Sequence, residues 1–203
     1  MKKFIVTISR EFGSGGRLVG RQLSERLGVP FYDRELIELA AEKSGLSKEF
    51  IARSDERASS VLSLGLAASA GAEVGYFMQY DALTGDRAFF AQSSVIHDLA
   101  EKGSCIIVGR CAGYLLRDNP DCVRILIHAP MDSRIERAKT TYGLPAKGLA
   151  DKIYKADKGR ANYHKHYTGD NWMDARSYDL CINTEVMGIE GAVDTIVKLL
   201  ENR

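Results

Sequence analysis

A glycine-rich turn between a strand-like run and a helix-like run constrains this chain most. Residues 4–8 are apolar and β-branched, as is typical of a strand buried on both faces. The turn SREFGSGG follows, and residues 17–27 then carry leucine and valine at helical spacing, with Gly28 as a stop. In this order, backbone N–H groups and the helix N-terminus can converge on a phosphate. We therefore expect a phosphate-binding loop, although an ordinary connection between strand and helix remains an alternative.

The loop departs from the Walker pattern G-x-x-x-x-G-K-[ST] at three places. Aligned on Gly15, the chain has Arg10 for the first glycine, Gly16 for the lysine and Arg17 for the residue that binds Mg²⁺. Arg17 is the nearest cation in sequence that could replace the lysine. The residues expected to hold the phosphates are Gly13, Ser14, Gly15, Gly16, Arg17 and Leu18.

Further along the chain, short apolar runs alternate with helical patterns. The runs cover residues 30–32, 105–108, 123–128 and 179–182, and the helical patterns cover 34–43, 89–102, 131–140 and 189–200. This alternation predicts a doubly wound α/β fold, in which helices cover both faces of a parallel sheet. Residues 44–88 do not fit the alternation and are expected to form an inserted helical region. Residues 142–171 do not fit it either, and they are rich in basic side chains.

Positive charge is concentrated in one part of the chain. Residues 134–165 carry nine Lys and Arg against three acids, a net charge of +6, while the other residues sum to −5. The overall charge of +1 argues against a strongly basic nucleic-acid binder. A local positive patch attracts anions, and phosphoryl transfer needs such cations. For any single lysine a solvated helix face is the simpler explanation, but we favour function for Arg134, Arg137 and Arg160 together.

The cysteine pattern and the hydropathy favour a soluble cytoplasmic protein. Four cysteines form no C-x-x-C pair, so they are expected to be reduced thiols. No apolar stretch is long enough to span a bilayer. His164 and His166 are two residues apart and do not share a helix face, and no nearby Cys or acid completes a ligand set. We therefore expect no protein metal site, no membrane and no nucleic-acid partner.

Four motifs taken together resemble the P-loop nucleoside monophosphate kinases, and specifically their cytidylate kinase-like branch. These are the glycine loop, the segment PFYDRELI at 30–37, the Gly-Arg pair at 109–110 and the D-x-x-R at 157–160. Their order and spacing carry the resemblance, which covers nearly the whole chain and includes HYTGDNWMDARSYDLCINT near the end. It implies a single domain over residues 1–203, with a five-stranded parallel core, a substrate-binding insertion at about 44–88 and a lid at about 140–171. It also implies ATP and Mg²⁺ as cofactors.

The resemblance assigns roles to individual residues. Those that match the family's substrate-binding positions are Asp33, Arg110, Asp157 and Arg160, of which Arg110 would hold the substrate phosphate. Arg134 and Arg137 fall on the helix that leads into the lid, where the family places arginines near the phosphates. We expect Arg17, Arg134 and Arg137 to replace the Walker lysine imperfectly. Cys111 stands where the family has an Asp, and Leu39 where it has a second arginine.

The function expected from these observations is ATP-dependent phosphoryl transfer to a nucleoside monophosphate, with CMP or dCMP as the first candidate. Two alternatives remain. One is a nucleotide-binding module of the same fold with lost or weak catalysis, as the altered Walker residues suggest. The other is a kinase for a different small acceptor, because the fold does not fix the acceptor. Nucleotide substrates are the partners expected, and the sequence predicts no particular oligomeric state.

Overall fold

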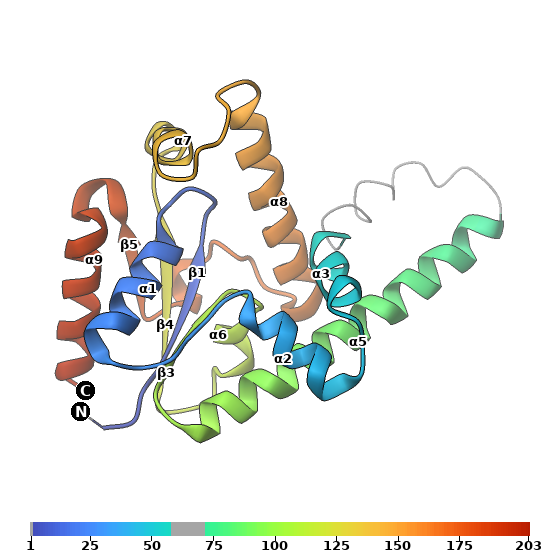
Figure 1. The fold of residues 1–203 in the computed structure, drawn as a ribbon, viewed down its shortest axis with the longest axis horizontal. Helices are drawn as coiled ribbons and strands as arrows, with labels where there is room; N and C mark the ends of the chain where they lie inside the picture. The colour runs from blue at the N-terminus through green and yellow to red at the C-terminus, as the bar shows by residue number, and fades with distance from the viewer. Residues whose placement is uncertain (1, 58–71) are drawn as a thin grey trace.

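Five parallel strands form the centre of the molecule (Figure 1). The computed structural model describes residues 2–57 and 72–203, with side chains for 2–52 and 85–203. The strand order is β2-β3-β1-β4-β5, so the first strand lies in the middle. The strands are β1 (Ile5–Arg10), β2 (Phe31–Tyr32), β3 (Cys105–Val108), β4 (Cys122–His128) and β5 (Leu180–Asn183).

The central strand is buried because both of its edges and both of its faces are covered. Val6 lies opposite Ile106 of β3, and Ile8 lies opposite Ile125 of β4. Ile5, Val6 and Ile8 are at most 1% exposed, which explains why this run has no alternating polar residues. All five strands run in the same direction, so their carboxyl ends meet at one edge of the sheet. The five-stranded α/β architecture expected from the sequence is confirmed.

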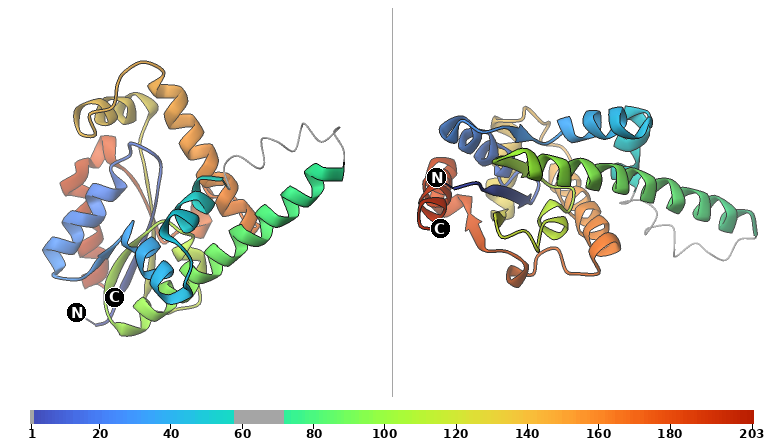
Figure 2. Two further views of the ribbon diagram at one scale, coloured as in Figure 1. Left: turned by 45° about the vertical axis from the view of Figure 1, so that its right-hand side comes forward. Right: turned by 90° about the horizontal axis from the view of Figure 1, so that it is seen from below.

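Two helices, α1 (Gly16–Leu27) and α9 (Thr184–Glu201), cover one face of the sheet (Figures 1 and 2). Val19 and Leu23 of α1 and Val193 and Ile196 of α9 pack together against the sheet, and all four are fully buried. Gly28 ends α1 in the left-handed conformation, as its position predicts. α9 begins five residues before the predicted start, and it contains a break at Gly188, whose φ is +67°.

The opposite face is covered by helices from the middle of the chain (Figure 1). They are α2 (Glu35–Ser44), α3 (Lys48–Arg57), α5 (Ala72–Lys102) and α6 (Ala112–Leu115). Leu36, Ile51 and Ile96, each 0% exposed, anchor α2, α3 and α5 in a second core. Apart from residues 45–47, the described part of the expected insertion at 44–88 is helical. Residues 58–71 of that insertion lie outside the described residues.

Two further helices lie beyond the carboxyl edge of the sheet (Figure 1). They are α7 (Met131–Thr140) and α8 (Leu149–Thr168), and a short 3-10 helix, η1 (Ala175–Ser177), follows. Ala138 of α7 and Leu149 and Ile153 of α8 form a small buried cluster against Phe12 of the glycine loop. Most of the expected lid is therefore one long helix docked beside the loop. Among the described helices, none is both long and apolar enough to cross a membrane.

Candidate active site

The glycine loop joins the carboxyl end of β1 to the first turn of α1. Gly13 and Gly15 have φ values of +79° and +85°, a conformation that side chains rarely adopt. A Cβ atom on Gly13 would lie 2.7 Å from the backbone oxygen of Arg134, so space also excludes a side chain there. The first turn of a helix has backbone N–H groups without acceptors inside the helix. The loop therefore presents donors to an anion at the start of α1.

Hydrogen bonds from two other elements hold this loop in shape. The Thr184 hydroxyl, at the start of α9, donates to the Ser14 carbonyl at 2.6 Å. The Arg137 guanidinium, on α7, donates to the Gly13 carbonyl at 2.7 Å. The Ser14 hydroxyl is itself used within the loop, because it donates to the Glu11 carbonyl at 2.9 Å. Side chains of α7 and α9 thus hold the Gly13 and Ser14 carbonyls in place, and this helps to orient the N–H groups of the loop.

Asp157 of α8 is the third support of the loop. Its carboxylate accepts a hydrogen bond from the Phe12 backbone N–H at 2.7 Å and forms an ion pair with Arg134 of α7. Arg160 also contacts it, with 3.2 Å between Nη1 and Oδ1. The Arg134 side chain is only 7% exposed, and its guanidinium also lies 3.7 Å from Glu11. One carboxylate therefore ties α7 and α8 to the loop.

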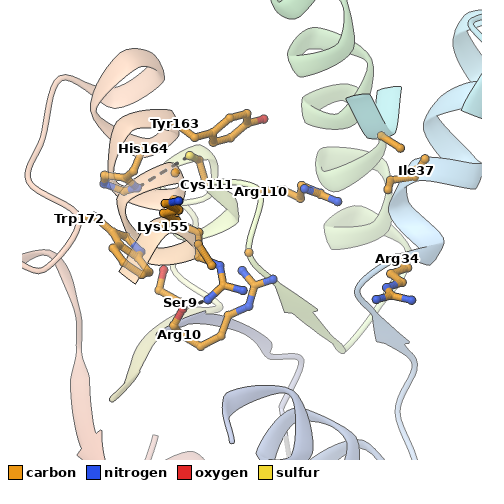
Figure 3. Close-up of a pocket in the computed structure, with 15 residues that line it drawn as sticks. Ser9, Arg10, Arg34, Ile37, Arg110, Cys111, Lys155, Tyr163, His164 and Trp172 are labelled. Atoms are coloured by element: carbon orange, nitrogen blue, oxygen red, sulfur yellow. Dashed lines mark hydrogen bonds between the residues drawn. The ribbon is translucent and has the colours of Figure 1, made fainter. Parts of the chain in front are cut away.

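Two cavities open at the carboxyl edge of the sheet. The first, called here the loop cavity, has a volume of about 520 Å³ and is lined by the glycine loop, Asp33 and Tyr142. The second cavity has a volume of about 580 Å³ and lies between the ends of β1 and β3, helices α2 and α3, and helix α8 (Figure 3). The side chains that line both cavities are Arg10, Arg34, Arg110 and Arg160. Four arginines thus mark the junction of the two cavities.

The junction of the two cavities lies where open α/β sheets bind ligands. Such sites lie beyond the carboxyl ends of two adjacent strands whose connections run in opposite directions. The connection after β1 leads toward β2, whereas the connection after β3 leads to β4 on the other side of β1. Gly109 and Arg110 directly follow β3, and the backbone of Arg110 has φ +56°. The strained conformation of Arg110 is typical of residues at functional sites.

The charges at the junction favour an anionic ligand. Asp33 pairs with Arg17, at 2.7 Å between Oδ2 and Nε, and lies 3.7 Å from Arg10. The second cavity is lined by the four arginines and Lys155, and none of its described lining residues is Asp or Glu. Burial lowers the pKa of Arg160, because the desolvation of its guanidinium outweighs the opposing attraction of the nearby Asp157 carboxylate. An anion bound here would offset that desolvation.

Some of the predicted site residues line the loop cavity, some line both cavities, and the others line neither. Gly13, Gly15, Gly16 and Arg17 line the loop cavity together with Asp33, whereas Ser14 and Leu18 do not. Arg110 and Arg160 line both cavities.

Ser14 and Leu18 line neither cavity, and neither do three predicted residues from α7 and α8 that support the loop. These three are Arg134, Arg137 and Asp157. The contact of Asp157 with a nucleotide, and the contacts of Arg134 and Arg137 with phosphates, therefore remain predictions.

Sequence reasoning missed three cations of the site. Arg10 occupied a glycine position of the Walker pattern and was treated only as a departure from it. Arg34 follows Asp33 directly, and Lys155 lies one turn before Gly159 and Arg160 on α8. Arg34 also supplies a cation to the junction, although the family arginine at position 39 is replaced by leucine. Its place next to Asp33 was the one signal in the sequence that could have identified it.

The residues present fit Mg²⁺ only in part. Among the described residues, the carboxylates that line the loop cavity are Glu11 and Asp33. Both already face arginines, and Glu11 also accepts a hydrogen bond from the Ala129 N–H at 3.1 Å. No group of three or more potential metal ligands occurs among the described residues. Mg²⁺ commonly keeps several waters and binds through one or two carboxylates plus substrate phosphates, and Asp33 suits such a role.

Comparison with known proteins agrees with this geometry. The family model described as "Cytidylate kinase-like family" matches residues 5–186. A cytidylate kinase from Pyrococcus horikoshii is 27% identical over 198 residues, which cover 97% of this chain and 87% of the relative. A cytidylate kinase from Desulfurococcus amylolyticus is 26% identical over 107 residues. That match spans 52% of this chain and only 57% of the relative.

Solved structures show the same architecture. An uncharacterized protein from Eubacterium ventriosum is 30% identical, with a TM-score of 0.72, and the match covers 99% of this chain and 100% of that one. A shikimate kinase from Bacteroides thetaiotaomicron is 16% identical, with a TM-score of 0.54, and the match covers 98% and 99% of the two chains. The second likeness concerns the fold alone. The fold is therefore that of the P-loop kinases.

Proposed function

The chain belongs to the cytidylate kinase-like family, and on that premise we propose that it transfers the γ-phosphoryl group of ATP to a nucleoside monophosphate. The observation that carries this proposal is the junction of the two cavities. The glycine loop lies on one side, a cation-lined cavity lies on the other, and four arginines are common to both. Phosphoryl transfer needs two anionic reactants held in line while cations offset the charge on the transferred group.

ATP would bind with its phosphates in the loop cavity. The N-terminus of α1 and the N–H groups of the loop suit the β-phosphate, and Arg17 lies at the rim of the same cavity. Arg134, Arg137 and Asp157 would act by holding the loop in the conformation that presents these donors. This extends the expected role of Arg134 and Arg137 from direct contact with phosphate to positioning.

The acceptor would bind in the second cavity with its phosphate toward the shared arginines. Ile37, Tyr163 and Trp172 also line this cavity and offer apolar groups to a nucleobase (Figure 3). A phosphate acceptor suits the lining, because its oxygens are already largely deprotonated near pH 7. A hydroxyl acceptor instead needs a base to take its proton. The described lining of this cavity has no carboxylate for that role and only one imidazole, that of His164.

In the proposed step, an oxygen of the acceptor phosphate attacks the γ-phosphorus of ATP. The bond between that phosphorus and the oxygen bridging to the β-phosphate breaks, and its electron pair leaves with ADP. The other product is a nucleoside diphosphate. The chain's arginines would keep the reactants together and offset the charge on the transferred group. Asp33 would hold Mg²⁺, which would supply further positive charge beside the phosphates.

CMP and dCMP are the acceptors we propose first, on the strength of the family and of the two cytidylate kinases that the chain resembles. One observation favours a second candidate, a nucleotide-binding module with weak or no transfer. Gly16 replaces the Walker lysine, and Arg17 at the position of the Mg²⁺ ligand already pairs with Asp33. The two candidates differ in turnover rather than in ATP binding.

The test is a coupled assay of ADP release with ATP and Mg²⁺, run with CMP, dCMP, UMP, AMP, GMP and shikimate as acceptors. ATP binding is measured in parallel by titration calorimetry. We expect release of ADP that depends on a nucleoside monophosphate, fastest with CMP or dCMP, with one nucleoside diphosphate formed per ADP. ATP binding without turnover on any acceptor would instead identify a binding module. Turnover on shikimate alone would overturn the choice of acceptor class.

A further inference from the structure

Arg10 and Gly16 face each other across the glycine loop, and only one of the two positions has room for a side chain. A Cβ atom on Gly16 would lie 2.5 Å from Cβ and 3.2 Å from Cγ of Arg10. Real Cβ contacts are essentially never this short. The chain therefore carries its cation at position 10 and keeps position 16 empty, whereas the Walker pattern has glycine first and lysine second.

The Arg10 side chain leads to the junction of the two cavities. Its guanidinium lies against Gly109, where a Cβ atom would be 2.2 Å from Nη1 and 3.0 Å from Cζ. Arg10 lines both cavities, and its side chain is 22% exposed. Its own carbonyl accepts a hydrogen bond from Arg160 at 3.1 Å, so the backbone at this point is also held.

Arg17 has a different environment, although it is the cation next to the missing lysine in sequence. Its Nε lies 2.7 Å from Asp33, its side chain is 41% exposed, and it lines the loop cavity but not the second cavity. The nearest Arg10 nitrogen to Asp33 is 3.7 Å away, a much looser contact. Of the two arginines, Arg10 is the one that lies between the proposed donor and acceptor.

We propose that Arg10 takes over the work of the Walker lysine by contacting the β- and γ-phosphates of ATP, and that Gly16 is glycine to leave room for it. This inference rests on the proposed phosphoryl transfer and adds a catalytic residue to it. A guanidinium offers several N–H donors in a plane, so it can hold two phosphate oxygens at once. At the junction it neutralises charge on the group that passes from one cavity to the other.

The test exchanges the two residues. Arg10→Gly removes the cation, Gly16→Lys forces a side chain into occupied space, and the double variant Arg10→Gly/Gly16→Lys restores the glycine and the lysine of the Walker pattern while Arg17 stays in place. We expect each single change to lower kcat about 100-fold, the loss typical of one contact to a transition-state charge. We expect the double variant to regain at least tenfold over Arg10→Gly. Arg17→Ala, in contrast, should cost less than Arg10→Gly.

A binding measurement separates this inference from the proposed function. ATP and adenosine affinities are measured for each variant, since adenosine carries no phosphate for Arg10 to contact. Arg10→Gly should weaken ATP at least tenfold and leave adenosine unchanged, even if the wild-type protein shows no turnover. Arg124→Gly on β4 is the matched control for a half-buried, ion-paired strand arginine, with 29% of its side chain exposed, and it should leave ATP affinity unchanged. Unchanged ATP affinity in a folded Arg10→Gly variant, or no recovery in the double variant, would overturn the inference.

Discussion

Two lysines one turn apart on α8 differ in what their side chains face. Lys155 lines the second cavity and not the loop cavity, whereas Lys158 lines neither. Both are exposed, so neither contributes much to the folded core. The pair therefore offers a clean comparison between a lysine at the proposed acceptor site and a lysine on a solvated helix face.

We predict that Lys155→Met raises the KM for the nucleoside monophosphate about fivefold to tenfold and leaves ATP affinity unchanged. The reason is the loss of one cation that faces the acceptor phosphate, worth about 1 kcal/mol at a partly solvated site. Lys158→Met should change neither constant. Steady-state kinetics with each substrate varied, together with ATP calorimetry, measures both. Equal effects of the two variants would remove Lys155 from the acceptor site.

Single residues were the least predictable level of this site. The sequence did not predict the contacts of Asp157 with the Phe12 N–H and Arg134, and its contact with a nucleotide stays a prediction. Which way a residue of α8 faces depends on how α8 docks on α7 and on the loop, and the local sequence does not encode that docking. By contrast, Gly13 and Gly15 were predictable, since a positive φ beside a strand end favours glycine whatever packs around it.

At the scale of elements, the corner between β5 and α9 supports the loop through one hydroxyl. Thr184 is 2% exposed, and its hydroxyl donates to the Ser14 carbonyl at 2.6 Å. We predict that Thr184→Val lowers the free energy of unfolding by about 1–3 kcal/mol, because a buried carbonyl loses its donor. ATP affinity should fall severalfold as the loop loosens. Thr184→Ser keeps the donor and should keep most of both properties.

Denaturant unfolding and ATP calorimetry check this prediction. A Thr184→Val variant as stable as wild type, with unchanged ATP affinity, would show that the hydroxyl does not support the loop.

Helix α8 should also confer a pH dependence on stability. His164 is 8% exposed, and burial lowers its pKa from the ordinary value of 6.5, with Asp170 opposing the change. The folded state therefore binds its proton less readily than the unfolded state. The contribution of the buried, neutral His164 to the free energy of unfolding is fully present above about pH 6.5. It is lost as the pH falls below that value, at up to about 1.4 kcal/mol per pH unit.

We predict that His164→Gln reduces the loss of unfolding free energy between pH 7.5 and pH 5.5. The exposed His97 on α5 supplies the control, because His97→Gln should leave the loss as in wild type. Denaturant titrations at the two pH values measure the difference. An identical pH dependence in wild type and His164→Gln would contradict the assignment.

The elements that alternate along the chain were predictable to within a few residues. The five strands and helices α1, α2 and α7 follow from apolar runs and from caps such as Gly28. Helix α8 was not recognised as one long helix, because Lys, Asp and Tyr interrupt its apolar stripe and only Leu149, Ile153, Gly159 and His164 are buried. The early start of α9 was missed because Gly188 breaks the periodicity.

For the whole molecule, the fold predicts two anion sites that open toward each other. α1 and its loop come from one face of the sheet, and α2 from the other, while α8 closes the second cavity from beyond the carboxyl edge (Figure 1). The segment 134–165, with its net charge of +6, contains most of α7 and α8. The charge distribution in the sequence indicated that this segment meets anions, but only the three-dimensional arrangement brings Arg10, Arg34 and Arg110 to the same place.

The central claim is that donor and acceptor bind at the same time, on either side of the shared arginines. A dinucleoside pentaphosphate, in which five phosphates join adenosine to cytidine, would span both cavities. Its binding is measured by displacement of a fluorescent ATP analogue and by inhibition kinetics against each substrate, with adenosine tetraphosphate as the control that lacks the cytidine. We predict competition with both ATP and the nucleoside monophosphate, and a Kd at least tenfold below that of either ATP or the control. Competition with ATP alone, at the affinity of the control, would contradict the account.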